Sequence, residues 1–127
     1  MENTEQILAR IEKLEFHLGL IAESLNRTEN PVGALVVGFN WSEKDLDSAH
    51  DIFDSFDKKL GESKTLNRTE FEAEFRKKLS ISYQALKSVV LAFYRNGQWV
   101  EVCHAYALSF GDTVPIELKS ILIDNLR

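Results

Sequence analysis

The sequence has a single cysteine, Cys103, which excludes an intramolecular disulfide. It also lacks an uninterrupted apolar run of roughly 18 residues, the length that a membrane-spanning helix needs. Its first residues, Met-Glu-Asn-Thr-Glu, are acidic, and no apolar stretch with a small-residue cleavage site follows them as in a secretory signal. We therefore expect a cytoplasmic protein that has no membrane segment.

An excess of basic residues is missing as well. The chain has 15 Lys and Arg against 20 Asp and Glu, which gives a formal net charge of −5. Broad binding to nucleic acid or to anionic membranes is typical of a basic surface. The charge balance therefore argues against both kinds of partner.

Motifs that carry common chemistry are absent from the sequence. It contains no glycine-rich phosphate loop, no Walker sequence, no serine nucleophile elbow and no zinc-ligand spacing. The length of 127 residues, with 44% hydrophobic and 28% charged residues, is that of one globular domain. We expect a single domain over residues 1–127 that is not an enzyme and needs no cofactor.

A regular apolar pattern is present in the first 25 residues. Isoleucine and leucine recur at alternating spacings of four and three residues, which is the heptad pattern through which helices pair. We call these residues the seam: Ile7, Ile11, Leu14, Leu18, Ile21 and Leu25. Three further apolar residues of the same helix lie off the seam, at Leu8, Phe16 and Leu20.

A helix over about residues 4–25 with two apolar stripes is expected to be covered on two sides, for example by its own domain and by a second copy of the chain. The seam therefore predicts a homodimer or a small oligomer. Isoleucine and leucine are mixed at both seam positions, so the pattern does not fix the number of chains.

Several helix starts with side-chain caps follow along the chain. Pro31 suits a first helical position, with Asn30 as its cap, and we favour a short helix over a strand for 32–39. Ser42 and Asp45 form a capping box, and the helix that follows is expected to end at Gly61. Its apolar positions are Leu46, Ala49, Phe53, Phe56 and Leu60.

A second start of the same design comes at Asn67, where Glu70 completes the box. The short helix after it directs Phe71, Phe75 and Leu79 inward. A last helix is expected from about Pro115 to Leu126, capped by Asp112 or Thr113. Together these elements predict an all-α bundle of six to seven helices.

The segment 82–110 has two readings. Asn96-Gly97 between two apolar segments is typical of a β-hairpin turn. The apolar residues of both segments nevertheless recur at helical spacing, so two antiparallel helices joined by a left-handed cap at Asn96-Gly97 are the favoured reading. The hairpin stays as the alternative.

Two polar clusters are candidates for chemistry. Asp47, His50 and Asp54 share one face of a helix, as metal ligands do in helical bundles. The apolar face of that helix points elsewhere, so a solvated acidic face is favoured over a metal site. The basic residues Arg76, Lys77 and Lys78 suggest a modest patch for a partner, and nucleic acid is the less favoured occupant.

Cys103 and Trp99 each fit either a structural or a functional role. Cys103 lies on an apolar stripe, so a buried, inert thiol is favoured over a nucleophile. Trp99 follows the Asn96-Gly97 turn and is expected either in the core or at the centre of an interface.

Four segments occur in order over roughly residues 9–107: 11–17, Pro31 with 34–36, 41–44 and 92–99. Together they resemble a small family of uncharacterised all-helical bacterial proteins typified by the YhaI protein of Bacillus. The chain departs from that pattern by a few extra residues at 80–84 and by an extension past Phe110. The resemblance implies an all-helical fold and self-association, and it implies no activity.

The sequence thus predicts an interaction or regulatory protein that assembles through the seam and binds another, unidentified protein. A nucleic-acid-associated factor that uses the basic patch is the first alternative. A metal-binding helical protein centred on the acidic face is the second.

Overall fold

The computed structural model describes residues 3–25 and 28–124 of the chain. Within these residues the chain forms seven α-helices and one short 3-10 helix and has no strand, so the predicted all-α class is confirmed. The elements are α1 (Thr4–Glu23), α2 (Pro31–Gly38), α3 (Glu43–Ser63), α4 (Arg68–Leu79), α5 (Tyr83–Arg95), α6 (Val100–Leu108), the 3-10 helix η1 (Gly111–Thr113) and α7 (Ile116–Asp124).

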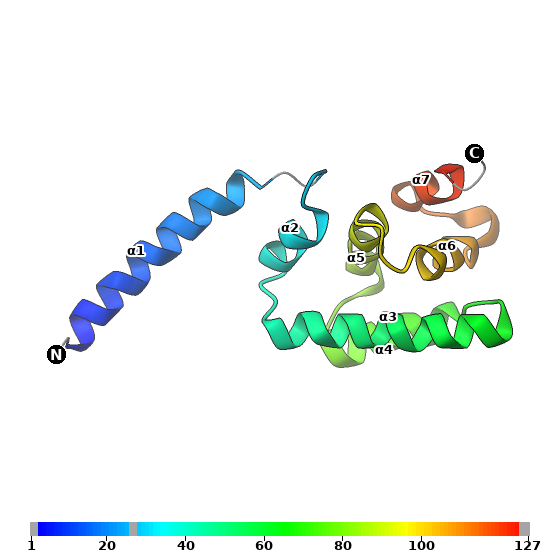
Figure 1. The fold of residues 1–127 in the computed structure, drawn as a ribbon, viewed down its shortest axis with the longest axis horizontal. Helices are drawn as coiled ribbons and strands as arrows, with labels where there is room; N and C mark the ends of the chain where they lie inside the picture. The colour runs from blue at the N-terminus through cyan, green and yellow to red at the C-terminus, as the bar shows by residue number, and fades with distance from the viewer. Residues whose placement is uncertain (1–2, 26–27, 125–127) are drawn as a thin grey trace.

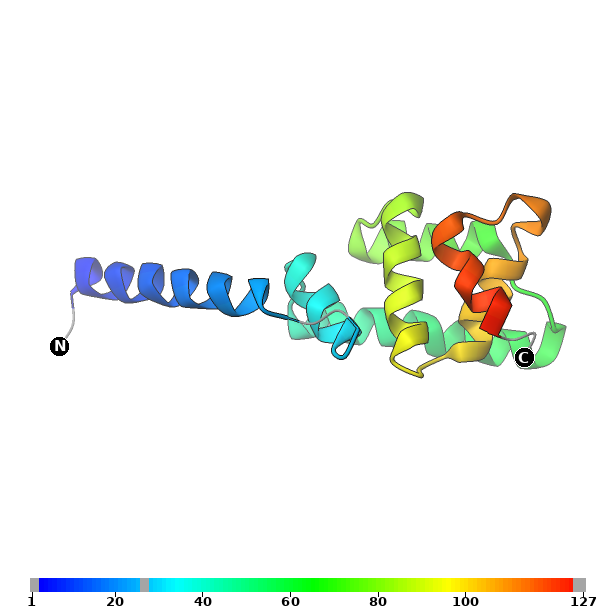
Figure 2. The same cartoon turned by 90° about the horizontal axis from the view of Figure 1, so that it is seen from above.

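Helices α2 to α7 pack together, and we call residues 31–124 the body. Helix α2 packs on α5, α3 packs on α4 and α6, and α7 packs on α5 and α6. Figures 1 and 2, two views at right angles, show α1 pointing away from the body along the long axis of the molecule. The predicted compact bundle is therefore formed by α2 to α7.

Aromatic rings from α3, α4 and α5 hold the centre of the body together. Phe53 is fully buried, and its ring centroid lies 5.7 Å from that of Phe71, 5.6 Å from that of Phe75 and 4.9 Å from that of Phe93. Such tilted and edge-to-face pairs stabilise a core beyond the area that they bury. Tyr106 of α6 completes the cluster, and its hydroxyl donates a 2.7 Å hydrogen bond to Glu72.

The predicted apolar face of α3 is the face that packs in the body. Ala49, Phe53 and Phe56 are buried, and Leu46 and Leu60 pack half-buried at the edge of the core. The capping box before α3 is formed on both sides. The backbone N–H of Asp45 donates to Ser42 Oγ at 3.1 Å, and the backbone N–H of Ser42 donates to Asp45 Oδ2 at 2.9 Å.

The α5–α6 junction confirms the helical reading of 82–110. Helix α5 ends at Arg95 in a Schellman motif, in which Gly97 has the left-handed φ of +72°. The N–H of Gln98 donates to the carbonyl of Phe93 at 2.9 Å, and the N–H of Gly97 donates to that of Tyr94 at 3.0 Å. The Asn96-Gly97 dipeptide that also suits a hairpin therefore ends a helix here.

Two predicted helix ends are wrong. Helix α1 ends at Glu23 rather than at Leu25, because the hydroxyl of Ser24 donates to the carbonyl of Ile21 at 2.6 Å. Helix α3 runs through Gly61 to Ser63 and ends at Lys64, whose φ is +67°. A glycine costs an exposed helix only about 1 kcal/mol relative to alanine, too little to stop a helix that is already long.

Two predicted caps also differ. Asn67 does cap α4 by accepting from the N–H of Glu70 at 3.1 Å, but the Glu70 carboxylate binds the ammonium group of Lys59 and does not complete a box. Asp112 and Thr113 lie in η1, where the Thr113 hydroxyl donates to the carbonyl of Phe110. The last helix begins at Ile116, one residue after the predicted start near Pro115. Its predicted end, Leu126, lies outside the described residues.

Candidate functional site

The apolar surface of α1 is the most prominent feature that the fold leaves uncovered. No residue of Thr4–Glu23, all of which are described, is buried. Its large apolar side chains are 43–65% exposed: Ile7, Leu8, Ile11, Leu14, Phe16, Leu18, Leu20 and Ile21. Exposed apolar surface of this extent is typical of an interaction site. Five of the six seam residues belong to it, and the sixth, Leu25, follows α1 and is half-buried.

The N-terminus of α1 is capped by local side chains. Asn3 and Gln6 form a capping box, with the N–H of Gln6 donating to Asn3 Oδ1 at 2.8 Å and the N–H of Asn3 donating to Gln6 Oε1 at 3.0 Å. These bonds satisfy two donors at the helix start without help from the body. The helix therefore has local reasons to form, although nothing in the body packs along it.

Most of the apolar residues of α1 lie on two opposite faces, and Leu8 lies between these faces. Successive residues of an α-helix are about 100° apart around its axis, so the seam residues gather on one side. Ala9, Phe16 and Leu20 lie on the opposite side, and we call these three residues the outer face. The seam runs the whole length of α1, whereas the two large residues of the outer face lie in its C-terminal half.

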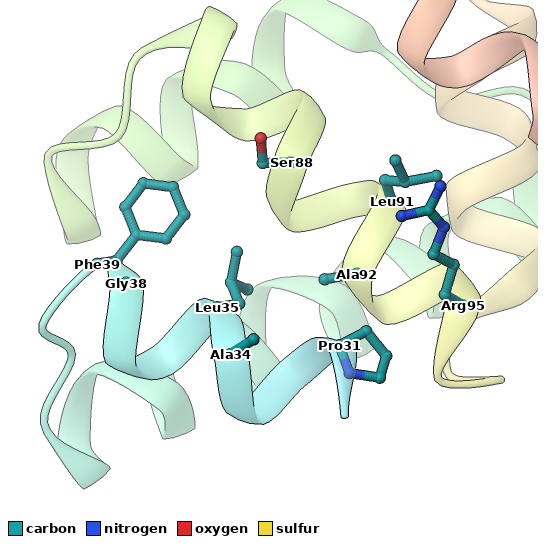
Figure 3. A pocket seen from close by; sticks show the side chains of 9 residues that line it. All are labelled: Pro31, Ala34, Leu35, Gly38, Phe39, Ser88, Leu91, Ala92 and Arg95. Carbon is teal, nitrogen blue, oxygen red and sulfur yellow. The ribbon is translucent and has the colours of Figure 1, made fainter. Parts of the chain in front are cut away.

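A groove between α2 and α5 is the second uncovered apolar feature. Its volume is about 310 Å³, and Figure 3 shows Leu35 of α2 and Phe39, the residue after α2, facing α5 across it, with Arg95 at one end. Its lining residues are Pro31, Ala34, Leu35, Gly38, Phe39, Ser88, Leu91, Ala92 and Arg95. Most of the lining side chains are apolar, although polar and apolar atoms contribute about equally to the groove surface, and the only charged group among the lining residues is the Arg95 guanidinium.

Sequence reasoning missed this groove, although α2 carried a signal for it. The segment Pro31–Gly38 has no polar side chain. A helix that is apolar all round has more apolar surface than one neighbour can cover. Helix α2 packs on α5 through Leu35, while Val37 stays 51% exposed.

Trp99 belongs to the interior contacts of the body. Its ring stacks on Phe53 at 5.2 Å between centroids, and its Nε1–H donates to Asp54 Oδ1 at 2.9 Å. Its backbone is left-handed, with φ of +47°, a conformation that costs a non-glycine residue about 1–2 kcal/mol. The ring stacking and the hydrogen bond hold this strained residue at the start of α6.

The basic residues Arg76, Lys77 and Lys78 are exposed in the last turn of α4. Lys78 pairs with Glu74 one turn away, at 3.1 Å between Nζ and Oε2. Cations in this place also interact favourably with the carbonyl end of their own helix. The patch therefore has a structural role at the end of α4.

The acidic face of α3 does not gather a metal site. Asp47 and Asp54 are exposed, while the ring of His50 packs against Phe93 and Trp99. Among the described residues, no three His, Cys, Asp or Glu side chains lie close enough to hold a metal ion. The carboxylate of Asp54 instead accepts the hydrogen bond from Trp99.

Cys103 is fully buried in α6, and its Sγ–H lies 3.5 Å from the carbonyl oxygen of Val90. Burial raises the pKa of this thiol to about 12, so it is protonated at neutral pH. A protonated, inaccessible thiol is a poor nucleophile.

Three comparisons with known proteins bear on the chain. Residues 4–108 match the family described as protein of unknown function (DUF1878), and this match spans α1 to α6. No curated protein and no solved structure matches the chain. In the part of the chain that the structure describes, none of the helices is long and apolar enough to pass through a bilayer.

Proposed function

The chain belongs to the DUF1878 family, whose description assigns no activity, and we propose a function from the surface of α1. The protein is a non-enzymatic interaction protein that assembles through the seam as a homodimer or small oligomer. In this form it binds another protein. The observation that carries the proposal is that a helix with two apolar faces has no buried residue.

The size of the seam fits a reversible assembly. Fully burying a Leu or Ile side chain yields about 1.5–3 kcal/mol, and the seam side chains of α1 are already about half covered. Two copies of α1 therefore gain on the order of 10 kcal/mol from seam burial. Association costs about 4–15 kcal/mol in lost freedom, so the seam alone supports a weak to moderate dimer.

Charges beside the seam favour a parallel pair. In a parallel coiled coil, the residue just before one seam position faces the residue just after the next seam position of the partner helix. Arg10 precedes Ile11 and Glu15 follows Leu14, so these two residues meet with opposite charge between parallel copies. In an antiparallel pair Arg10 and Glu15 do not meet in this way, because a residue before one seam position then faces another residue that precedes a seam position.

Further apolar side chains on the body support a protein partner for the assembled form. Ile116 and Ile123 of α7 are 78% and 53% exposed, and their spacing of seven residues places them on the same face. This helix lies outside the residues that match the family. It is therefore a candidate for contacts particular to this chain.

The two alternative functions, a nucleic-acid-associated factor and a metal-binding protein, are not supported by a comparable surface feature. For a nucleic-acid factor, α4 carries Glu70, Glu72 and Glu74 beside its three basic residues, so the helix has no extended positive surface. For a metal protein, Asp47, His50 and Asp54 lack a further ligand among the described residues.

We also propose, as the narrower identity, that the chain is a relative of the YhaI protein of Bacillus and acts in the bacterial cytoplasm. The proposal depends on the segments 11–17, 34–36, 41–44 and 92–99 that carry the resemblance. All of them lie within the residues that match the family.

Light scattering across a dilution series tests the assembly. We expect a mass that is a multiple of 14.5 kDa for the natural chain. The double variant Leu14→Asp with Ile21→Asp is expected to be monomeric, because two buried carboxylates per helix oppose pairing. Leu8→Asp changes an exposed leucine that lies between the seam and the outer face of the same helix, and it is the matched control.

A natural chain that is monomeric at every concentration contradicts the proposal. So does a double variant that keeps the oligomeric mass. The thermal unfolding of the body should be the same in the variant and the control, which separates lost assembly from lost folding.

A further inference from the structure

We propose that the groove between α2 and α5 is the binding site for the outer face of α1 from a second copy of the chain. The inference rests on the proposed self-association, since the seam is what brings a second copy close. In this arrangement the outer face of α1 contacts the groove of the second copy, while the seam contacts the α1 of that copy.

The groove has room for the two large residues of the outer face. A cavity of about 150 Å³ lined by apolar side chains holds a benzene ring, and the groove encloses about 310 Å³. Phe16 and Leu20 are four residues apart and lie one above the other on the helix surface. The half-buried side chains of Phe39 and Leu91 line the groove and are available to contact them (Figure 3).

Charge complementarity supports the same pairing. Glu23 lies one turn after Leu20 and places a carboxylate at the C-terminal end of the apolar pair. At the N-terminal end, Glu12 and Lys13 lie one turn before Phe16 and carry opposite charges. The groove has the Arg95 guanidinium at one end (Figure 3). A helix that enters with its outer face down and its C-terminal end at Arg95 brings the Glu23 carboxylate toward this guanidinium.

The direction of α1 favours the groove of a second copy over that of its own body. Figures 1 and 2 show α1 leaving its own body, and both Phe16 and Leu20 are more than half exposed. These residues lie only about 10 Å and about 5 Å from the C-terminal end of α1 along its axis. In a parallel pair both bodies lie at that end.

Site-directed cross-linking in a mixture of two full-length variants tests the proposal. One chain carries Leu20→Cys on the outer face, and the other, with a size tag, carries Ser88→Cys on the groove. A short bismaleimide should join them into a covalent heterodimer. The native Cys103 is fully buried and does not compete.

The matched control replaces Ser88→Cys by Ser55→Cys, an exposed serine of α3 that does not line the groove. We expect at least tenfold less heterodimer with this control. Both serine substitutions are nearly isosteric and lie on the surface, so folding is preserved, and the unchanged melting temperature verifies this.

Equal yields with the two serine positions overturn the proposal, as does no heterodimer. A double variant of Leu20→Cys and Ser88→Cys that cross-links only within one chain overturns the assignment to a second copy. Light scattering of the same variants reports the seam separately. An oligomeric mass without groove cross-linking refutes the groove alone, whereas a monomeric mass refutes the proposed function as well.

Discussion

Helices α1 and α3 are nearly the same length, 20 and 21 residues, and both begin with a complete capping box. They differ in what covers them. Helix α3 buries Ala49, Ile52, Phe53 and Phe56, whereas α1 buries no residue. The comparison shows that local signals decide where a helix forms, while the remainder of the fold decides which of its faces is covered.

The distribution of polar residues explains part of the difference. Helix α3 has one apolar face and an acidic one, where Asp47, Asp51 and Asp54 are exposed. One side of it therefore needs a neighbour, and the body supplies it. Helix α1 has the seam on one side and the outer face on the other. The body of the same chain covers neither of these faces.

The largest expected difference comes from the same substitution in the two helices. Phe53→Ala should lower the free energy of unfolding of the body by about 3–5 kcal/mol, because it removes the ring at the centre of the aromatic cluster. Phe16→Ala should leave the urea midpoint of the body unchanged in dilute solution. If both variants are destabilised equally there, α1 packs on its own body and the contrast is lost.

The pH dependence of stability should come from the body and depend on Cys103. Burial raises the pKa of this thiol from 9.0 to about 12, so the neutral thiol favours the folded state. This contribution is complete below pH 9 and is lost as the pH rises toward 12, because the thiol ionises first in the unfolded chain. Urea unfolding at several pH values should show the decline.

The alanine variant of the same residue provides the control. Cys103→Ala lowers stability at neutral pH, but its free energy of unfolding should fall less steeply than that of the natural chain above pH 9. If the free energy of unfolding falls equally steeply with pH in the natural chain and in the Cys103→Ala variant, other ionisable groups cause the decline. Tyr106, whose pKa is also raised by burial and by its hydrogen bond to Glu72, is the next candidate.

Removing one capping box from each helix should have a smaller effect on stability. The effect should be measurable in the unfolding of the body for α3 and in the helix content for α1. Ser42→Ala should cost the body about 1 kcal/mol, because the N–H of Asp45 loses its acceptor. Asn3→Ala removes the equivalent acceptor from α1. We expect it to lower the helical circular dichroism signal with little change in the unfolding midpoint of the body, and a shift as large as that of Ser42→Ala would show coupling between them.

Surface charge should matter least. Lys78→Ala breaks the pair with Glu74, and exposed pairs of this spacing contribute only about 0.2–0.5 kcal/mol. Chemical denaturation should place this variant within that range of the natural chain. A loss above 1 kcal/mol would mean that the basic end of α4 supports the body more than its exposure suggests.

Much of the body follows from short stretches of sequence. The cap at Ser42, the cap at Asn67 and the turn at Gly97 depend on residues within one helical turn, so their patterns are readable without a fold. The inward positions of α3 follow from the helical period. The helix end at Lys64 and the turn of η1 were missed, because the competing conformations there differ by about 1 kcal/mol or less.

The candidate site divides in the same way. The seam and the outer face were visible as apolar spacings, and the family match spans both. The α2–α5 groove was not visible, because Leu35 and Leu91 are far apart in the sequence and meet only when α2 packs on α5. Trp99 was ambiguous for a similar reason, since its partner Asp54 is 45 residues away.

The sequence by itself determined that this chain is helical, where most of its helices begin, and that α1 carries two apolar stripes. These properties depend on capping residues and on spacings of three and four residues, which act over a few ångströms. Only the tertiary structure decided that neither stripe of α1 is covered and that α2 and α5 enclose an open apolar groove. Burial depends on which distant segments occupy the space beside a side chain, and that is settled only when the whole body has packed.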